Sequence, residues 1–229
     1  MGRGAIGRLL GAAAAIVAAS GAIALAASSN GVASRSPSAI VTAVRNAVDG
    51  VSSVHVAGAF VESGESLALN LYLVANRGGR GTVTENGASF SLVVVGKVLY
   101  FKASTAFWKR FGNTASANLF AGKWLKTPTT GQYASVSAFT DIHTLFAQLL
   151  SPKGKLTKGP TTTLHGQPAV GVTNPADGGI LYVATTGKPY PLEVAGNTKN
   201  GQLVINGIDQ PVTLTPPKTS IDISKLGHQ

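Results

Sequence analysis

The sequence predicts an α+β fold: a strongly curved antiparallel β-sheet, or half-open barrel, with helices packed on or plugging its concave side. Two observations support this prediction. Along several short segments apolar residues recur with a period of two, and glycine, proline and asparagine turns separate these segments. Helical spacing is confined to other segments, so helices and strands are segregated along the chain, which is typical of α+β proteins.

The first segment of the chain predicts export. Arg3 and Arg8 precede a long uncharged run rich in alanine, and Ala24 and Ala26 form an A-x-A-like cleavage site. We expect residues 1–27 to be a secretory signal peptide that is removed. The alternative is an uncleaved anchor, because the run is long enough to span a bilayer, although alanine and glycine drive insertion weakly.

The remainder is expected to form one domain. Residues 28–36 have the composition of a flexible leader, and residues 37–229 contain no composition break that would divide them. Ser28 stands where a bacterial lipobox would place its acylated cysteine, and a serine has no thiol to carry the lipid. We therefore expect a protein secreted to the periplasm or cell wall, and anchored to the membrane only if the signal segment stays attached.

Local patterns predict the elements in order. A helix is expected over 37–49, because Ser36 can cap it, Pro37 suits its first turn and Gly50 can end it. Alternation predicts strands over 66–75 and, in two pieces, over 88–103, while the glycine-rich segment 76–81 is expected to interrupt the chain. Three further helices are expected over 104–112, 114–122 and 137–152. One strand is expected over 122–128, and the C-terminal strands are expected over 155–209.

Composition limits the function classes. The chain carries a formal charge of +10 with only 12% charged residues, which favours contact with anionic lipid headgroups or wall polymers outside the cytoplasm rather than nucleic acid. It has no cysteine, so disulfides, thiolate catalysis and cysteine-ligated metals are excluded. The four histidines lack metal-ligand spacing, and no nucleophile elbow or phosphate-binding loop occurs. We expect no catalytic residue, no metal and no cofactor.

Four segments resemble one known group of proteins when they are taken in order: VSSVHVAGAF, VLYFKASTAFW, FAGKWLKT and LYVATTGKPYPLEV. They look like actinobacterial cell-envelope proteins of the LppX/LprG type, within the LolA-like superfamily, and the likeness runs from about residue 37 to residue 223. The resemblance implies a half-open barrel around a helix-gated hydrophobic cavity that carries lipids or acylated glycolipids. Some relatives instead sense envelope lipoproteins or regulate a protein partner. Many members begin with a lipidated cysteine, from which Ser28 departs.

Several strands carry apolar residues on both faces, so the sheet face that the helices leave free must also be shielded from water. If the curled sheet leaves its interior unfilled, that interior becomes a ligand cavity; the alternative is a filled core. Phe107, Trp108 and Phe111, beside Lys109 and Arg110, could form a membrane-docking mouth or simply a packed helix. The residues expected to line the cavity or its mouth are Leu69, Leu71, Tyr72, Phe90, Leu92, Val94, Tyr100, Phe107, Trp108, Phe111, Trp124, Phe139, Ile142, Phe146, Leu149, Tyr182 and Leu192.

The leading hypothesis from the sequence is a secreted, monomeric, non-enzymatic carrier of a lipid or acylated glycolipid that meets anionic membranes transiently. The second is an envelope sensor or interaction module of the same fold with a filled cavity and a protein partner. The third is a hydrolase, which would require a serine or aspartate close to a histidine within a cleft.

Overall fold

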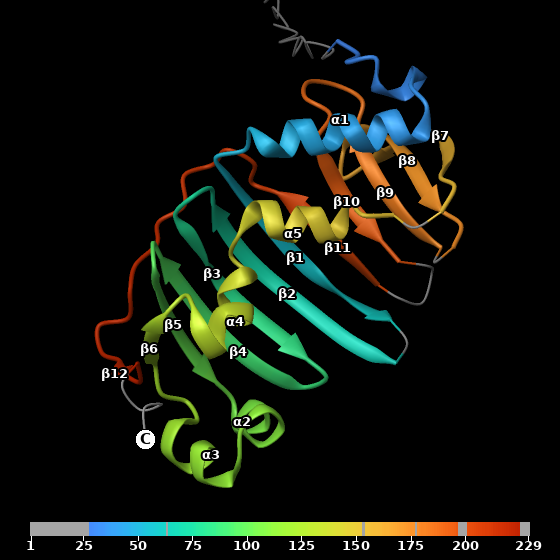
Figure 1. Cartoon of the computed structure of the whole chain (residues 1–229). Helices are drawn as coiled ribbons and strands as arrows, with labels where there is room; N and C mark the ends of the chain where they lie inside the picture. Colours follow the sequence, from blue (N-terminus) through green and yellow to red (C-terminus); the bar gives the residue numbers. More distant parts are fainter. Residues whose placement is uncertain (1–27, 63, 153, 177, 197–200, 225–229) are drawn as a thin grey trace, which may run out of the picture.

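Twelve strands form one open, curved sheet in the computed structural model (Figure 1). The structure describes residues 28–62, 64–152, 154–176, 178–196 and 201–224, so the predicted signal peptide lies outside the described residues. The strand order is β12-β6-β5-β4-β3-β2-β1-β11-β10-β9-β8-β7, and every pairing is antiparallel except that of β12 with β6. The predicted α+β architecture, with a curved antiparallel sheet and helices on one face, is confirmed.

The sheet has two halves that meet at the β1–β11 pair, where His55 lies opposite Asn206 and Phe60 opposite Gly201. The N-terminal half is a meander of β1 (Ser53–Glu62), β2 (Glu65–Val74), β3 (Gly78–Glu85), β4 (Ala88–Val95), β5 (Val98–Ala103) and β6 (Leu125–Pro128). The C-terminal half consists of β7 (Thr157–Leu164), β8 (Gln167–Asn174), β9 (Gly179–Ala184), β10 (Pro191–Ala195) and β11 (Gly201–Asn206), and β12 (Ile221–Asp222) returns to the opposite edge.

The helices lie on one face and at one end of the sheet (Figure 1). They are α1 (Pro37–Asp49), α2 (Thr105–Phe111), α3 (Thr114–Phe120), α4 (Ala134–Ala138) and α5 (Ile142–Leu149), with 3-10 turns at Val32–Ser34 and Gly131–Tyr133. As predicted, the Ser36 hydroxyl caps α1 by accepting the Ala39 N–H at 3.4 Å. No helix among the described residues has both the length and the apolar character needed to cross a bilayer.

The helix predicted over 137–152 is two helices, α4 and α5, with a break between them. The Asp141 carboxylate accepts the Thr144 N–H at 2.6 Å and so starts a new helix, and the Thr140 hydroxyl donates to the Ser137 carbonyl at 2.8 Å. These side-chain bonds satisfy backbone groups that a continuous helix would pair internally. The apolar spacing across the break is nearly helical, which is why periodicity alone predicted one element.

The segment 76–81 was expected to interrupt the chain, and its first two residues do so: Asn76 and Arg77 lie in the turn after β2, whereas residues 78–81 form the start of β3. A side chain at Gly79 would place its Cβ 3.1 Å from the Thr140 Cβ and 2.7 Å from the Tyr72 carbonyl oxygen. The missing side chain therefore lets the α4–α5 link lie directly on the sheet. The prediction of a break is confirmed for the turn at residues 76–77 and wrong for residues 78–81, whose glycines serve close packing within the sheet.

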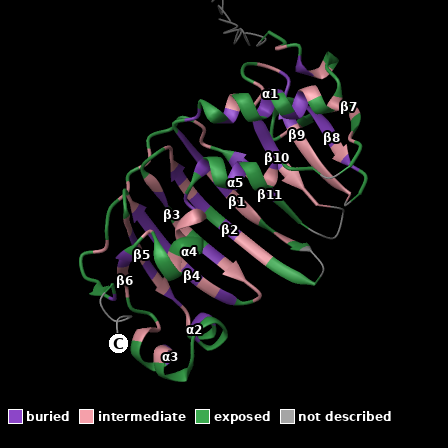
Figure 2. Cartoon of the chain, in the orientation of Figure 1, coloured by how far each residue is buried: buried purple, intermediate pink, exposed green. Residues whose placement is uncertain are grey.

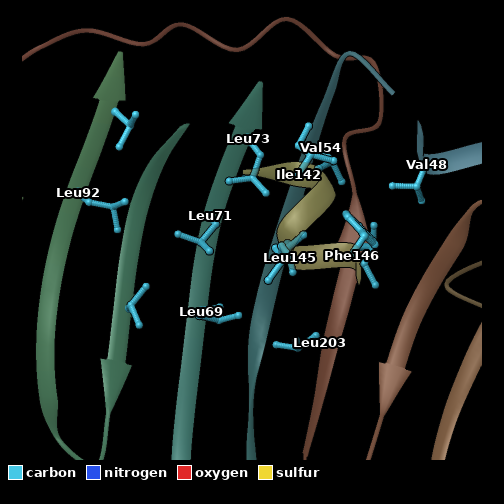
Figure 3. Packing of buried hydrophobic residues seen from close by; sticks show 14 of the residues in the cluster. Val48, Val54, Leu69, Leu71, Leu73, Leu92, Ile142, Leu145, Phe146 and Leu203 are labelled. Atoms are coloured by element: carbon cyan, nitrogen blue, oxygen red, sulfur yellow. The ribbon is translucent and has the colours of Figure 1, made fainter. Parts of the chain in front are cut away.

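The centre of the helix-covered face is filled by side chains (Figure 3). From β2, Leu69, Leu71 and Leu73 point toward α5, whose Ile142 and Phe146 belong to the same cluster, and all five side chains are buried (Figure 3). Val54 of β1, Leu92 of β4, Leu145 of α5 and Leu203 of β11 belong to the same hydrophobic cluster. The middle of this face is therefore a packed core.

The link between β11 and β12 runs along the ends of the meander strands (Figure 1), and Asp209 fastens its start to β1. The Asp209 Oδ1 accepts hydrogen bonds from the N–H and the hydroxyl of Ser52, both at 2.8 Å, and its Oδ2 accepts one from the Tyr190 hydroxyl at 3.3 Å. Above all the backbone bond from Ser52 lowers the pKa of Asp209. Because the pKa is lower in the folded chain, the stabilisation is present above the unfolded-state pKa and is lost as the pH falls through the folded pKa.

Asp209→Asn is expected to reduce the free energy of unfolding by about 1 kcal/mol at neutral pH, since it keeps an acceptor but removes the charge. Asparagine also tolerates the left-handed backbone at this position, where φ is +59°. The difference from the wild type should shrink as the pH falls below about 4. Urea denaturation of both proteins at neutral pH and in acid checks this; a difference of equal size in both conditions would contradict the role of the charge.

Candidate functional site

An aromatic cleft lies at the end of the sheet where α2, α3 and α4 meet β4. Its volume is about 680 Å³. Within it, Phe90 of β4 lies at ring-centroid distances of 5.4 Å from Phe107 and 6.0 Å from Phe139, in edge-to-face geometry. We call this hollow the aromatic cleft; it is lined by Glu85, Phe90, Phe107, Trp108, Phe111, Gly112, Ser116, Gln132, Tyr133, Ser135, Val136 and Phe139.

Ser104 fixes the position of α2 against the sheet. Its hydroxyl accepts the N–H of Phe107 at 3.1 Å, which caps the helix, and the N–H of Ser89 at 3.2 Å, which ties the cap to β4. The Ser104 N–H in turn donates to the Ser89 carbonyl at 2.8 Å. The two aromatic residues of α2 that face the sheet, Phe107 and Trp108, are consequently held at a defined distance from Phe90.

The opposite wall comes from the segment that leads into α4. The Ser137 hydroxyl donates to the Thr129 carbonyl at 2.9 Å and so anchors α4 beside the end of β6. Val136 and Tyr133 face the cleft, and the Tyr133 ring lies 4.9 Å from that of Phe101. Burial raises the pKa of Tyr133, while its hydrogen bond with Gln132 acts in the opposite direction, so its phenol stays neutral near pH 7.

The rim of the aromatic cleft carries a small ion-pair cluster. Nη2 of Arg110 lies 3.2 Å from Oε1 of Glu85 and 3.7 Å from Oε2 of Glu65. All three side chains are exposed, so these pairs contribute little to stability. They do orient the last turn of α2 toward the β2–β3 side of the sheet.

Trp108 is 5% exposed, and its Nε1–H is buried without a hydrogen-bond acceptor among the described residues. A buried donor that lacks an acceptor costs roughly 1–3 kcal/mol. The indole packs against Phe101, Phe107 and Phe120 at centroid distances of 5.9, 5.5 and 5.5 Å. The inner wall of the cleft is therefore almost purely aromatic, with one unmet polar group.

Five of the residues predicted to line the cavity or its mouth meet in this cleft: Phe90, Phe107, Trp108, Phe111 and Phe139. Another five are buried in the packed core and line none of the hollows found here: Leu69, Leu71, Leu92, Val94 and Ile142. Phe146 and Leu149 lie beside smaller hollows between α5 and α1, of about 300 and 170 Å³. The centre of this face is thus the filled core that the sequence left as the alternative to a cavity, because α5 occupies that space.

The other predicted residues lie on the opposite, largely helix-free face of the sheet. Tyr72 stacks on His55 at 4.1 Å, and Tyr100 alternates with the fully buried Leu99 and Phe101. Trp124 lies 5.3 Å from the Lys102 ammonium. Tyr182 pairs across the sheet with Glu193, and Leu192 belongs to a separate small cluster with Ala169 and Ala184. Because neighbours in a strand point to opposite faces, one cavity cannot receive both Leu71 and Tyr72.

The cleft residues that come from 132–136 and from α3 were not predicted from the sequence. Tyr133, Val136 and Ser116 have no periodic neighbours that would assign them to a buried face. The only local signal for this wall is the pair of turn-forming residues Pro128 and Gly131 before the helices, which predicts a change of direction but not its target.

A catalytic arrangement would require a nucleophile beside a histidine, and no histidine lines the aromatic cleft. His143 lies 3.4 Å from Asp49, and both share a hollow with Ser151 near α1. However, the Ser151 hydroxyl donates to the Ala147 carbonyl, and no hydrogen bond between Ser151 and His143 occurs among the described residues. Among the described residues no group of three His, Asp or Glu side chains is placed to hold a metal ion.

Comparison with solved structures finds the same kind of fold. LprF from Mycobacterium bovis superposes with a TM-score of 0.52 at 14% identity, covering 79% of this chain and 96% of LprF. The Mycobacterium tuberculosis lipoprotein LppX gives 0.47 at 19% identity, covering 79% of this chain and all of LppX, and MucB, solved in complex with MucA, gives 0.36 at 12% identity, covering 80% and 58%. No protein-family model and no curated protein matches the sequence. At these identities the likeness to LprF establishes the fold alone.

Proposed function

From the LolA-like fold of the LppX/LprG type, which this chain shares with LprF, we propose that the protein is an exported carrier that holds the acyl chain of a lipid or acylated glycolipid in the aromatic cleft. The observation that carries the proposal is the cleft itself. A volume of about 680 Å³ lies within the range of roughly 300–1,000 Å³ typical of small-molecule sites. Six of its twelve lining residues are aromatic, which suits an acyl chain, and the polar ones are Glu85, Ser116, Gln132 and Ser135.

Burial of acyl methylenes supplies a favourable binding free energy at such a site, and no catalytic group is needed for it. Each buried methylene contributes about 0.8 kcal/mol, so ten methylenes contribute about 8 kcal/mol. Before the costs of association, that figure corresponds to a Kd of about 1 μM.

The test uses the chain from residue 28 onward, which contains all twelve strands and the hydrophobic core. The variant Trp124→Phe leaves Trp108 as the sole tryptophan, because the sequence has two. We expect a long-chain fatty acid to change the Trp108 fluorescence, and native mass spectrometry of protein purified from a bacterial host to show a co-purified lipid. If no lipid co-purifies and the fatty acid leaves the fluorescence unchanged, the proposal fails.

The second candidate is an envelope interaction module without transport, and the packed centre of the sheet favours it. Because α5 fills the space that a central cavity would need, the hydrophobic core is packed without any ligand. This candidate predicts normal folding, no co-purified lipid and a protein partner. The same mass-spectrometric measurement distinguishes the two candidates.

A further inference from the structure

We infer that the α2–α3 hairpin is the surface with which this protein contacts an anionic phospholipid bilayer, and that Phe111 and Leu119 enter the bilayer there. Among the described residues these two are the most exposed large hydrophobic side chains, at 53% and 57%. Both lie on one hairpin at one end of the molecule, where Figure 2 shows largely exposed helices.

The hairpin holds these side chains outward by its own packing. Phe107, Trp108 and Ala117 are buried on its inner side, and the Phe120 ring lies 5.5 Å from that of Trp108. The Asn113 side chain caps α3 by accepting the Ser116 N–H at 2.8 Å. With the inner positions taken, Leu119 projects away from the core, and Phe111 stays half exposed at the rim of the aromatic cleft.

The charge of the hairpin fits an anionic surface. Residues 104–124 contain Lys109, Arg110 and Lys123 and no acidic residue. Arg110 is paired with Glu85 and Glu65, whereas neither lysine forms an ion pair within the described part of the chain. Two unpaired ammonium groups on the same hairpin as two exposed apolar side chains match a surface of lipid phosphates above acyl chains.

A bilayer is favoured over a protein partner by the size of the patch. Two apolar side chains and two lysines cover far less than the roughly 1,200 Å² that a stable protein interface buries. A bilayer needs no shape complementarity, so a few inserted side chains with nearby cations suffice for reversible binding. Lysine is moreover depleted from protein–protein interfaces.

The inference rests on the proposed function in one respect, because Phe111 also lines the aromatic cleft and docking would set the mouth of that cleft against the bilayer. An acyl chain could then pass between membrane and cleft without crossing water. The exposed position of Phe111 thus joins the two sites, while Leu119 belongs to the docking surface alone, since it does not line the cleft.

The experiment measures co-sedimentation of the chain from residue 28 with vesicles of phosphatidylcholine alone or mixed with phosphatidylglycerol. We expect binding to the mixed vesicles, about tenfold weaker binding for the double variant Phe111→Ser/Leu119→Ser, and loss of the preference for phosphatidylglycerol in Lys109→Gln/Lys123→Gln. The control is Val61→Ser, which removes another exposed hydrophobic side chain, 41% exposed and outside the hairpin, and should bind as the wild type does.

The inference would be overturned if both double variants bound the mixed vesicles as strongly as the wild type does. It would also be overturned if the wild type bound neither kind of vesicle. Circular dichroism of each variant checks that the fold is kept, and the lysine variant serves as the test if the apolar one unfolds. Vesicle binding is measured without a fatty acid and fatty-acid binding without vesicles. A failure of docking is therefore distinguishable from a failure of the proposed carrier function.

Discussion

Ser116→Trp is expected to weaken fatty-acid binding at least about tenfold while leaving the melting temperature unchanged. Ser116 lies in the first turn of α3, is partly exposed and lines the aromatic cleft. An indole at this position would occupy space that acyl methylenes need. Displacing two methylenes costs about 1.6 kcal/mol, and a tenfold change in Kd corresponds to about 1.4 kcal/mol.

The matched control for this variant is Ala115→Trp. Ala115 is the preceding residue of α3, is exposed and does not line the cleft. The two variants add the same side chain to the same helix turn, so any difference between them reports on the cleft. Isothermal titration with a long-chain fatty acid measures both, and scanning calorimetry checks their stability. Equal affinities for the two variants would place the ligand elsewhere, for instance in the hollows beside α1.

Alternation along the sequence predicted most strands because each strand has a buried face, and it failed to locate the site because several strands have two apolar faces. Leu71 and Tyr72 both qualified as cavity residues on hydropathy. Only the placement of α5 over one face decides that Leu71 is core and that Tyr72 stacks on His55 on the other side. That choice depends on contacts between residues about 70 positions apart in the chain, which a local period does not encode.

The aromatic wall of the site was predictable where it lay on a helix with its own pattern. Phe107 and Phe111 are four residues apart, so they share a helix face, and their rings lie 5.0 Å apart. Tyr133 and Val136 were not predictable, because α4 is a single short turn whose position is set by the Ser137 hydroxyl and by the end of β6. Hydrogen bonds of this kind fix tertiary position without leaving a periodic trace in the sequence.

The exposure of Leu119 likewise could not be predicted from the sequence. By sequence this residue belongs to the segment 114–122, which predicts a short helix but does not say which of its apolar residues are buried. The structure buries Ala117 and half-buries Phe120, and leaves Leu119 the most exposed of the large apolar side chains described. The exposure of an apolar residue therefore becomes visible only once its neighbours have been placed.

The glycine-rich start of β3 gives the largest effect on stability that we predict. Gly81→Ala is expected to lower the free energy of unfolding by about 3 kcal/mol or more. A Cβ at this position would lie 2.0 Å from the Asn70 carbonyl oxygen and 2.9 Å from the Leu71 Cα, and φ is +155°. β3 is paired with β2 and with β4 on its two sides, so neither neighbour can move away without breaking a ladder.

Gly87→Ala separates backbone strain from this steric overlap. Gly87 also has a positive φ, +77°, but a Cβ there would meet no atom within 4 Å because the residue sits in the β3–β4 turn. That variant should lose only about 1 kcal/mol, from the unfavourable left-handed backbone. Urea denaturation followed by circular dichroism compares the two. Equal losses would mean that β3 can shift to admit a side chain. Close packing of the glycine-rich strand against its neighbours, including the α4–α5 link, would then not explain the three glycines in the segment 78–81.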